Sequence, residues 1–284
     1  MNAPMQDQSL ASSSGIRIRH RMPVVFGPSS GPRQGPDGLP FDWTDAPRST
    51  ASVSFLTDAE RLSRLLPPGF RLEGDPVVTV EATTLTDLPW LAGRGYRMLG
   101  VKFGTRFDGK RDTAIGPFLA VLWENRPEPI LTGREELGFA KLYAELPEPR
   151  QFSNVQHHQA SWDGHTFLEM DLSELANTRP VSPPQPSADA LSGTLHWRYL
   201  PALDPADADI EQAVLTPDGG FEVRYETFKR GKGTVRFLRS NWEQIPTMFH
   251  IVNALADLPI LESRGATFSS TRGAKDLSDQ RVLR

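Results

Sequence analysis

The 284-residue sequence contains no cysteine, which excludes disulfide bonds, thiolate metal ligands and a cysteine nucleophile. It also lacks an excess of positive charge, because 31 lysines and arginines face 35 aspartates and glutamates. A nucleic-acid partner is therefore not expected. Apolar runs of the roughly 20 residues that a membrane helix needs are missing, and residues 1–21 lack the apolar core of a signal peptide. These absences favour a cytoplasmic protein with no membrane partner.

The chain is long enough for one large domain or two small ones, and nothing in the sequence requires two. Residues 1–20 are polar and rich in serine and glutamine, a composition typical of a flexible tail. Five prolines then predict an extended arm over residues 22–43, of a kind that often packs over a neighbouring subunit. Residues 269–284 are polar again and predict a mobile or inter-subunit tail, which leaves 21–268 as the domain.

Segments with β-branched residues or period-two alternation recur along the chain and are separated by turn residues. Such a series favours an α+β fold, a single β-rich domain built on a mainly antiparallel sheet or barrel with a few short helices. The predicted strands are 49–56, 77–81, 96–107, 115–123, 154–162, 165–172, 195–200, 210–215 and 221–227.

Two short helices interrupt the predicted strands. The capping-box pattern Thr57-x-x-Glu60 precedes leucines at helical spacing and predicts a helix that ends at Pro67. Apolar residues at positions 245, 248, 249 and 252 predict a second helix that ends near residue 256. The proline-rich segment 178–190 is predicted to be a connector.

The segment 131–143 is the most informative part of the sequence. Lys141 is flanked by apolar pairs at 139–140 and 142–143, and no carboxylate is nearer in the sequence than Glu136 and Glu145. Burial among apolar groups disfavours the charged form of a lysine and can lower its pKa by about 3–5 units, which produces a Schiff-base nucleophile. Lys141 is therefore a candidate nucleophile, and a solvated surface lysine is the alternative.

The same segment resembles a family signature. Gly133, Arg134 and Glu135, with Lys141 eight positions after the glycine and Phe139 two positions before the lysine, are similar to the acetoacetate decarboxylase pattern Gly-Arg-Glu-x-x-x-aromatic-Pro-Lys-Lys. The resemblance implies an acetoacetate decarboxylase-like fold, a homo-oligomer and a small keto-acid substrate, with no cofactor and no metal. It also implies that Gly133, Arg134 and Glu135 support the loop that presents Lys141.

The resemblance extends from about Met22 to Leu261 and identifies two further candidates. Arg48 matches a pocket arginine of the family and Glu81 matches a buried glutamate, with no gap between Arg48 and Asp58. Arg48 is expected to hold the substrate carboxylate, and Glu81 to fix Arg48 or relay protons. For both residues a surface charge on or beside a strand is the alternative.

Three positions depart from the family pattern. Leu142 replaces its second lysine, so desolvation alone would have to make the Lys141 amine neutral. Met98, two positions after Tyr96, replaces an active-site glutamate, which weakens protonation of the enamine that follows loss of carbon dioxide. Ala140 replaces the proline before the lysine.

The leading hypothesis is a Schiff-base enzyme that decarboxylates a small β-keto acid, with Lys141, Arg48 and Glu81 as catalytic residues. The expected pocket wall consists of Tyr96, Met98, Phe139 and Leu142. One alternative is a Schiff-base aldolase or dehydratase acting on pyruvate-like acids, and another is a non-catalytic protein that binds a small ligand. A metal enzyme is disfavoured because the adjacent histidines 157 and 158 point to opposite faces of a strand.

Overall fold

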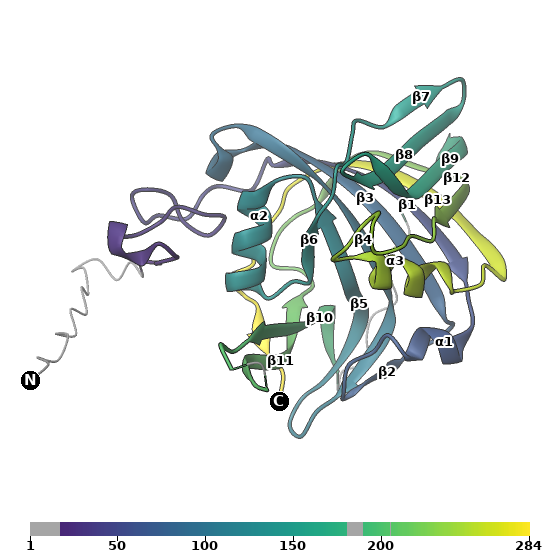
Figure 1. Cartoon of the computed structure of the whole chain (residues 1–284). Helices are drawn as coiled ribbons and strands as arrows, with labels where there is room; N and C mark the ends of the chain where they lie inside the picture. Colours follow the sequence, from purple (N-terminus) through teal and green to yellow (C-terminus); the bar gives the residue numbers. More distant parts are fainter. Residues whose placement is uncertain (1–17, 181–189, 205) are drawn as a thin grey trace, which may run out of the picture.

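In the computed structural model, which describes residues 18–180, 190–204 and 206–284, the strands form one large sheet (Figure 1). The strand order is β14-β11-β10-β5-β4-β3-β1-β13-β12-β9-β8-β7, with β2 paired to β4 and β6 paired to β5. Neighbouring strands are antiparallel except that β5 runs parallel to β6 and β10. The predicted β-rich, mainly antiparallel fold is confirmed. None of the described helices is long and apolar enough to cross a membrane.

The strands are β1 (Pro47–Leu56), β2 (Phe70–Leu72), β3 (Val77–Leu88), β4 (Arg94–Asp108), β5 (Thr113–Glu124), β6 (Lys141–Tyr143), β7 (Arg150–Phe152), β8 (Val155–Trp162), β9 (His165–Asn177), β10 (Leu191–Pro201), β11 (Ala208–Pro217), β12 (Arg224–Phe237), β13 (Glu262–Arg272) and β14 (Arg281–Val282). The helices are α1 (Ala59–Ser63), α2 (Pro127–Thr132) and α3 (Phe249–Ala256), with short 3-10 turns η1 (Val24–Phe26) and η2 (Pro89–Leu91) and a π-helical turn η3 (Gly133–Leu137).

Alternation along the central strands places the apolar side chains on one face of the sheet. In β1, Val53 and Phe55 are each 2% exposed, whereas Ser52 and Ser54 are half-buried on the other face. The apolar face forms one core cluster with residues of α1 and α3, and Figure 1 shows α3 lying across this side of the sheet. The opposite face of β1, β3 and β13 carries serines and threonines, which bond across the strands, as between Ser52 Oγ and Thr267 Oγ1 at 2.7 Å.

Trp123 fixes the orientation of β5 relative to this core. Its side chain is fully buried, its Nε1 donates to Met248 Sδ at 3.4 Å, and its ring centroid lies 5.3 Å from that of Phe167. Because side chains alternate along a strand, Leu122 and Glu124 point to the opposite face. That face carries the candidate site.

Both predicted helices begin later than the sequence pattern indicated. The N–H of Thr57 donates to Pro76 O, just before β3, so Thr57 still belongs to the end of the sheet. Asp58 therefore caps α1 in its place, and its side chain accepts from Arg61 N at 2.8 Å. The segment before α3 is occupied by a turn in which the side chains and backbone N–H groups of Asn241 and Gln244 bond reciprocally. Phe249, four residues after the predicted start, therefore opens α3.

The C-terminal residues differ from the predicted polar tail. The strand β13 continues to Arg272 between β1 and β12, and Val282 of β14 pairs with β11. Leu283 is 4% exposed. Serine and threonine dominate the end of β13, so its burial left no hydrophobic signal in the sequence, and cross-strand pairing stabilises it instead.

The N-terminal arm packs against its own chain beside α2, as both figures show. Its Arg21 forms a buried ion pair with Glu136 of η3, and Arg33 Nη2 donates to Gln280 Oε1 at 2.9 Å. Met22 and Phe26 project outward, with 79% and 85% of their surface exposed. The predicted flexible tail lies outside the described residues except for 18–20, and so does the connector at 181–189.

Candidate active site

The short strand β6 determines which way the candidate nucleophile points. It runs parallel to β5, with Lys141 paired to Leu122 and Leu142 paired to Trp123. Lys141 therefore lies on the face opposite the core, whereas Leu142 packs against the core cluster. The prediction that Leu142 lines the pocket is wrong, because adjacent strand residues face opposite sides. A lysine at position 142 would also point away from the Lys141 amine.

The amine of Lys141 is buried beside a carboxylate. The residue is 5% exposed, its Nζ lies 2.8 Å from Glu124 Oε1, and it donates to Pro129 O at 2.9 Å. The Phe139 ring centroid is 5.7 Å from Nζ. The sequence predicted an apolar setting without a nearby acid, and that part of the prediction is wrong, because the nearest carboxylate comes from a different strand.

Glu124 is the last residue of β5, directly after the buried Trp123, and is itself fully buried. Burial raises the pKa of Glu124, and the positive charge of Lys141 offsets part of this effect. In the described part of the chain, the carboxylate forms an ion pair with Lys141 Nζ and neither of its oxygens has a hydrogen-bond partner. Sequence reasoning missed this residue, although a charge at the end of an apolar strand that leads to the lysine segment was a usable signal.

A change of helical geometry presents Lys141 at this point. The helix α2 continues into the π-helical turn η3, which Gly138 ends with a φ of 75°. Such turns are rare and frequently occur at functional sites. A methyl group on Gly133 would lie 2.3 Å from Cδ, 2.4 Å from Cε and 2.5 Å from Nζ of Lys141. Glycine at 133 is therefore what allows the lysine side chain to cross the backbone of the turn.

Backbone contacts hold the lysine loop. Arg134 Nη1 donates to the carbonyl of Lys141 at 2.9 Å, and the carbonyl of Glu135 accepts from Arg198. Glu136 is held by the arm through Arg21. These are the contacts that a supporting role for the Gly-Arg-Glu segment requires.

A histidine that sequence reasoning also missed lies under the loop. His196 of β10 is fully buried, its Nε2 is 3.0 Å from Leu137 O, and its ring centroid lies 4.3 Å from that of Phe139. The carbonyl can only accept, so Nε2 carries the proton. Burial lowers the pKa of His196 to about 4, although the bond to Leu137 favours the charged form. The neutral imidazole thus connects β10 to Leu137, the last residue of η3, and to Phe139.

Acid should destabilise the fold through His196. The folded protein binds a proton at this site less readily than the unfolded chain, so stability is present above pH 6.5 and is lost as the pH falls towards 4. The expected loss is about 3 kcal/mol between pH 7 and pH 4. Urea unfolding of His196→Gln, in which an amide replaces the donor, should show a smaller loss over this range. Burial also lowers the pKa of His158 to about 4. His158 is present in both the wild type and the variant, so its contribution to the pH dependence is the same in each. If the free energy of unfolding depended on pH equally in the wild type and in His196→Gln, His196 would not be the source of the acid destabilisation.

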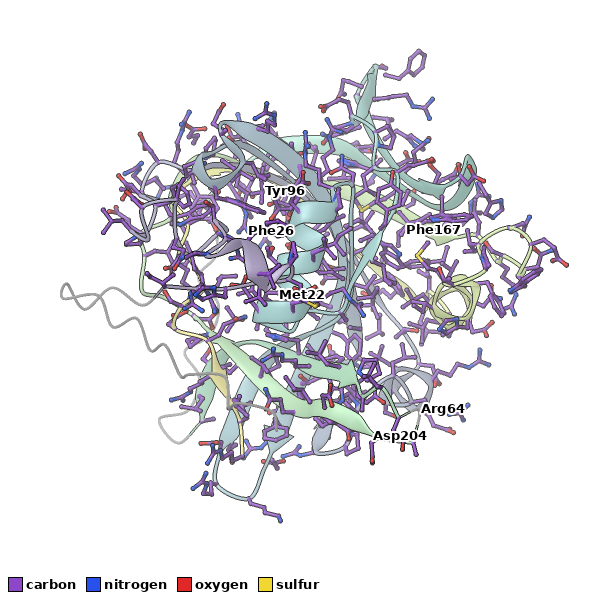
Figure 2. All side chains as sticks on the ribbon, turned by 60° about the vertical axis from the view of Figure 1, so that its left-hand side comes forward. Met22, Phe26, Arg64, Tyr96, Phe167 and Asp204 are labelled. Carbon is purple, nitrogen blue, oxygen red and sulfur yellow. The ribbon has the colours of Figure 1, made fainter. Side chains whose placement is uncertain are left out.

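Tyr96 and Met98 of β4 lie on the same face as Lys141. Met98 is the cross-strand partner of Glu124, and Tyr96 lies one alternation further along β4. Burial raises the pKa of Tyr96, the Glu124 carboxylate raises it further, and Arg48 lowers it. Figure 2 shows Tyr96 beside α2, and Arg126 at the start of that helix bonds to the adjacent Gly95 O at 2.8 Å. The phenol of Tyr96 therefore stays protonated at neutral pH.

Arg48 and Glu81 lie on this face as well, but farther from the lysine. The cross-strand pairing places Glu81 and Lys141 in one row, three strand spacings or about 14 Å apart at the backbone. Arg48 is in the row that contains Tyr96. The structure thus brings Lys141, Glu124, Tyr96 and Met98 together, whereas the backbones of Arg48 and Glu81 lie farther away and the charge of Arg48 acts on Tyr96.

The partner of Glu81 differs from the predicted one. Its Oε2 lies 2.6 Å from Lys102 Nζ, a residue that sequence reasoning did not single out. Burial acts to raise the pKa of Glu81, but Lys102 outweighs it, with a smaller contribution from Arg48, and holds this pKa below its ordinary value. The expectation that Glu81 is fixed to Arg48 is therefore corrected: the carboxylate pairs with Lys102, and Arg48 is left to act on other anions.

Comparisons with known proteins identify the family and the fold. The family model described as acetoacetate decarboxylase (ADC) matches residues 21–275. No curated protein sequence matches the chain. An acetoacetate decarboxylase structure from Legionella pneumophila superposes with a TM-score of 0.63 at 16% identity, covering 84% of this chain and 86% of the other.

Two further structures share the fold. Another acetoacetate decarboxylase structure gives a TM-score of 0.65 at 14% identity, covering 88% of this chain and 94% of that chain. The enduracididine biosynthesis enzyme MppR complexed with pyruvate gives 0.58 at 15% identity, covering 88% and 95%. At these low sequence identities, the comparisons show that the three proteins share the fold of this chain.

Proposed function

The chain belongs to the acetoacetate decarboxylase family, and from this membership we propose that it is a Schiff-base lyase that decarboxylates a small β-keto acid such as acetoacetate through Lys141. One observation carries the proposal: the lysine of the family signature has its amine buried, in contact with a carboxylate that can take its proton. Addition of the amine to a ketone needs the deprotonated form, and the pair provides a route to it.

The other residues have roles set by their positions on the same face. Arg48 orients the substrate carboxylate, for which its guanidinium offers two parallel donors. Lys102 neutralises Glu81, so this carboxylate does not occupy Arg48, which remains available for the substrate. Tyr96, Met98 and Phe139 surround the reacting carbon. In the imine the protonated nitrogen accepts the electron pair released with carbon dioxide, so the reaction needs no cofactor.

A second candidate is an aldolase or dehydratase that forms the same imine with a pyruvate-like acid. Met98 favours it, because the glutamate that the family has at this position is absent from β4. The structural likeness to an enzyme complexed with pyruvate supports the same candidate. Release of carbon dioxide from acetoacetate, measured directly, separates the two reactions.

Borohydride reduction tests both candidates together. Incubation with acetoacetate or pyruvate, followed by borohydride, should add the reduced ligand to the peptide that holds Lys141. Lys232→Met is a matched control, because Lys232 is an exposed lysine paired with Glu174 on distant strands and its loss should not change labelling. If neither acid gives an adduct at Lys141, and Lys141→Ala binds both acids as tightly as the wild type, the protein is a ligand-binding member of the family and not a Schiff-base enzyme.

A further inference from the structure

Glu124 lies where the protons of the Lys141 amine must be exchanged. Its Oε1 is 2.8 Å from Nζ, within the range of about 2.6–3.2 Å over which a side chain transfers a proton directly. The other polar contact of the amine is the Pro129 carbonyl, which is too weak a base to hold a proton at neutral pH. The side chain of Glu124 is thus the base in direct contact with the nucleophile.

The surroundings of Glu124 suit a group that both accepts and donates protons. It is fully buried, and neither of its carboxylate oxygens has a hydrogen-bond partner among the described residues. Oε1 has the ion-pair contact with Lys141 Nζ at 2.8 Å. A buried carboxylate used only for structure is normally satisfied by several donors. Oε2 is therefore available to accept from a hydroxyl of the reacting molecule, and burial raises the pKa of Glu124 above its ordinary value.

The pairing of β4 with β5 places Glu124 directly beside position 98. Met98 and Glu124 are direct cross-strand partners, and side chains so placed start about 5 Å apart at Cβ. The glutamate that the family carries at position 98 would project from the strand next to Glu124 and on the same face. This chain therefore keeps a carboxylate over the same region of the sheet but presents it from β5.

From this geometry we propose that Glu124 is the general acid–base catalyst of imine formation, an assignment that rests on the proposed Schiff-base function. Glu124 first accepts a proton from the Lys141 ammonium. The neutral amine adds to the ketone carbon, forming the C–N bond, while the carbonyl π electrons move to oxygen. Transfer of one proton from nitrogen to that oxygen through Glu124 gives a neutral carbinolamine.

The same group completes the dehydration. Protonated Glu124 donates its proton to the carbinolamine hydroxyl, the C–O bond breaks, and water leaves as the nitrogen lone pair forms the C=N bond. The products are a protonated imine, one water molecule and the Glu124 carboxylate, so charge and atoms balance. These steps precede both decarboxylation and aldol chemistry, and Glu124 serves either reaction.

Glu124→Gln tests the assignment by the rate of adduct formation. Samples mixed with pyruvate or acetoacetate and quenched with borohydride at successive times should show imine formation slowed about 100-fold, the lower part of the range for general acid–base catalysis. In the wild type the rate should fall on the acid side with an apparent pKa above that of an ordinary glutamate, because Glu124 must be ionised to accept the proton. The rate of Glu124→Gln should not show this decrease at low pH.

Two further variants keep the result interpretable. Glu124→Asp retains a carboxylate and should recover part of the rate and the decrease at low pH, whereas a purely structural role would give it no advantage over glutamine. Glu169→Gln removes a carboxylate paired with Arg236 far from the site and should match the wild type. If the wild type forms the adduct and Glu124→Gln forms it at the same rate or faster, the role of Glu124 is wrong but the Schiff-base function stands. Absence of an adduct in wild-type protein would overturn the Schiff-base function as well.

Discussion

Replacing Gly133 with alanine should lower kcat/KM by about 100-fold or more in protein that remains folded. The new methyl group would overlap the last three atoms of the Lys141 side chain, at 2.3–2.5 Å, and must displace the amine from Glu124. A misplacement of about 1 Å in a reacting group can cost this much in rate. Gly133 has a helical φ of −68°, so alanine meets no backbone strain. Its higher helix propensity, worth up to about 1 kcal/mol, offsets part of the stability that is lost when the amine moves away from the Glu124 carboxylate.

Steady-state kinetics and urea unfolding of the same preparation measure the two effects. Leu131→Ala is a suitable control, because Leu131 is 55% exposed on the adjoining helix and has no part in the clash. Wild-type activity in Gly133→Ala would contradict this prediction. A loss of activity that merely equals the fraction of unfolded protein would contradict it as well. That result would mean that Gly133 is needed for folding and not for the position of Lys141.

Lys141→Met should lower the free energy of unfolding by about 3 kcal/mol at pH 7, because it leaves the Glu124 carboxylate buried without its counter-charge. In the variant the folded state takes up a proton on Glu124 at a pH well above the ordinary value of about 4.5. A group whose pKa is raised on folding contributes stability that is lost as the pH rises through the folded value. The variant should therefore regain stability between pH 7 and pH 5.

The double variant Lys141→Met/Glu124→Gln separates charge from packing. With both charges removed, stability at pH 7 should recover most of what the single lysine substitution lost, and the recovery at low pH should disappear. A double-mutant cycle built from urea unfolding curves gives the coupling energy of the pair directly. Additive effects of the two substitutions would show that the amine and the carboxylate do not interact in the folded protein.

The sequence was sufficient for the parts of the fold that have regular hydrophobic patterns. Strand β1, with Val53 and Phe55 alternating with serines, and the central part of β4 were predicted close to their observed bounds. Strand β13 was not predicted, because the serines and threonines of its second half carry no apolar period and its place in the sheet depends on pairing with β1 over a long sequence separation. Pairing between distant segments has no local signature.

The candidate site shows the same limit at the level of single residues. Lys141 could be selected from its own segment, and its flanking residues correctly suggested burial. Glu124 is 17 positions earlier, and the parallel pairing of β5 with β6 is what brings it to the amine. Lys102 reaches Glu81 through the pairing of β3 with β4 in the same way. These two partners decide the charge of the site, and neither belongs to a recognisable motif.

The most direct test of the central claim is a crystal structure of the protein reduced with borohydride in the presence of pyruvate. Continuous density from Lys141 Nζ to the second carbon of the ligand, with a Glu124 oxygen within hydrogen-bond distance of the new bond, is the predicted result. A ligand bound without a covalent link, or an amine that turns away from Glu124 into solvent, would contradict it.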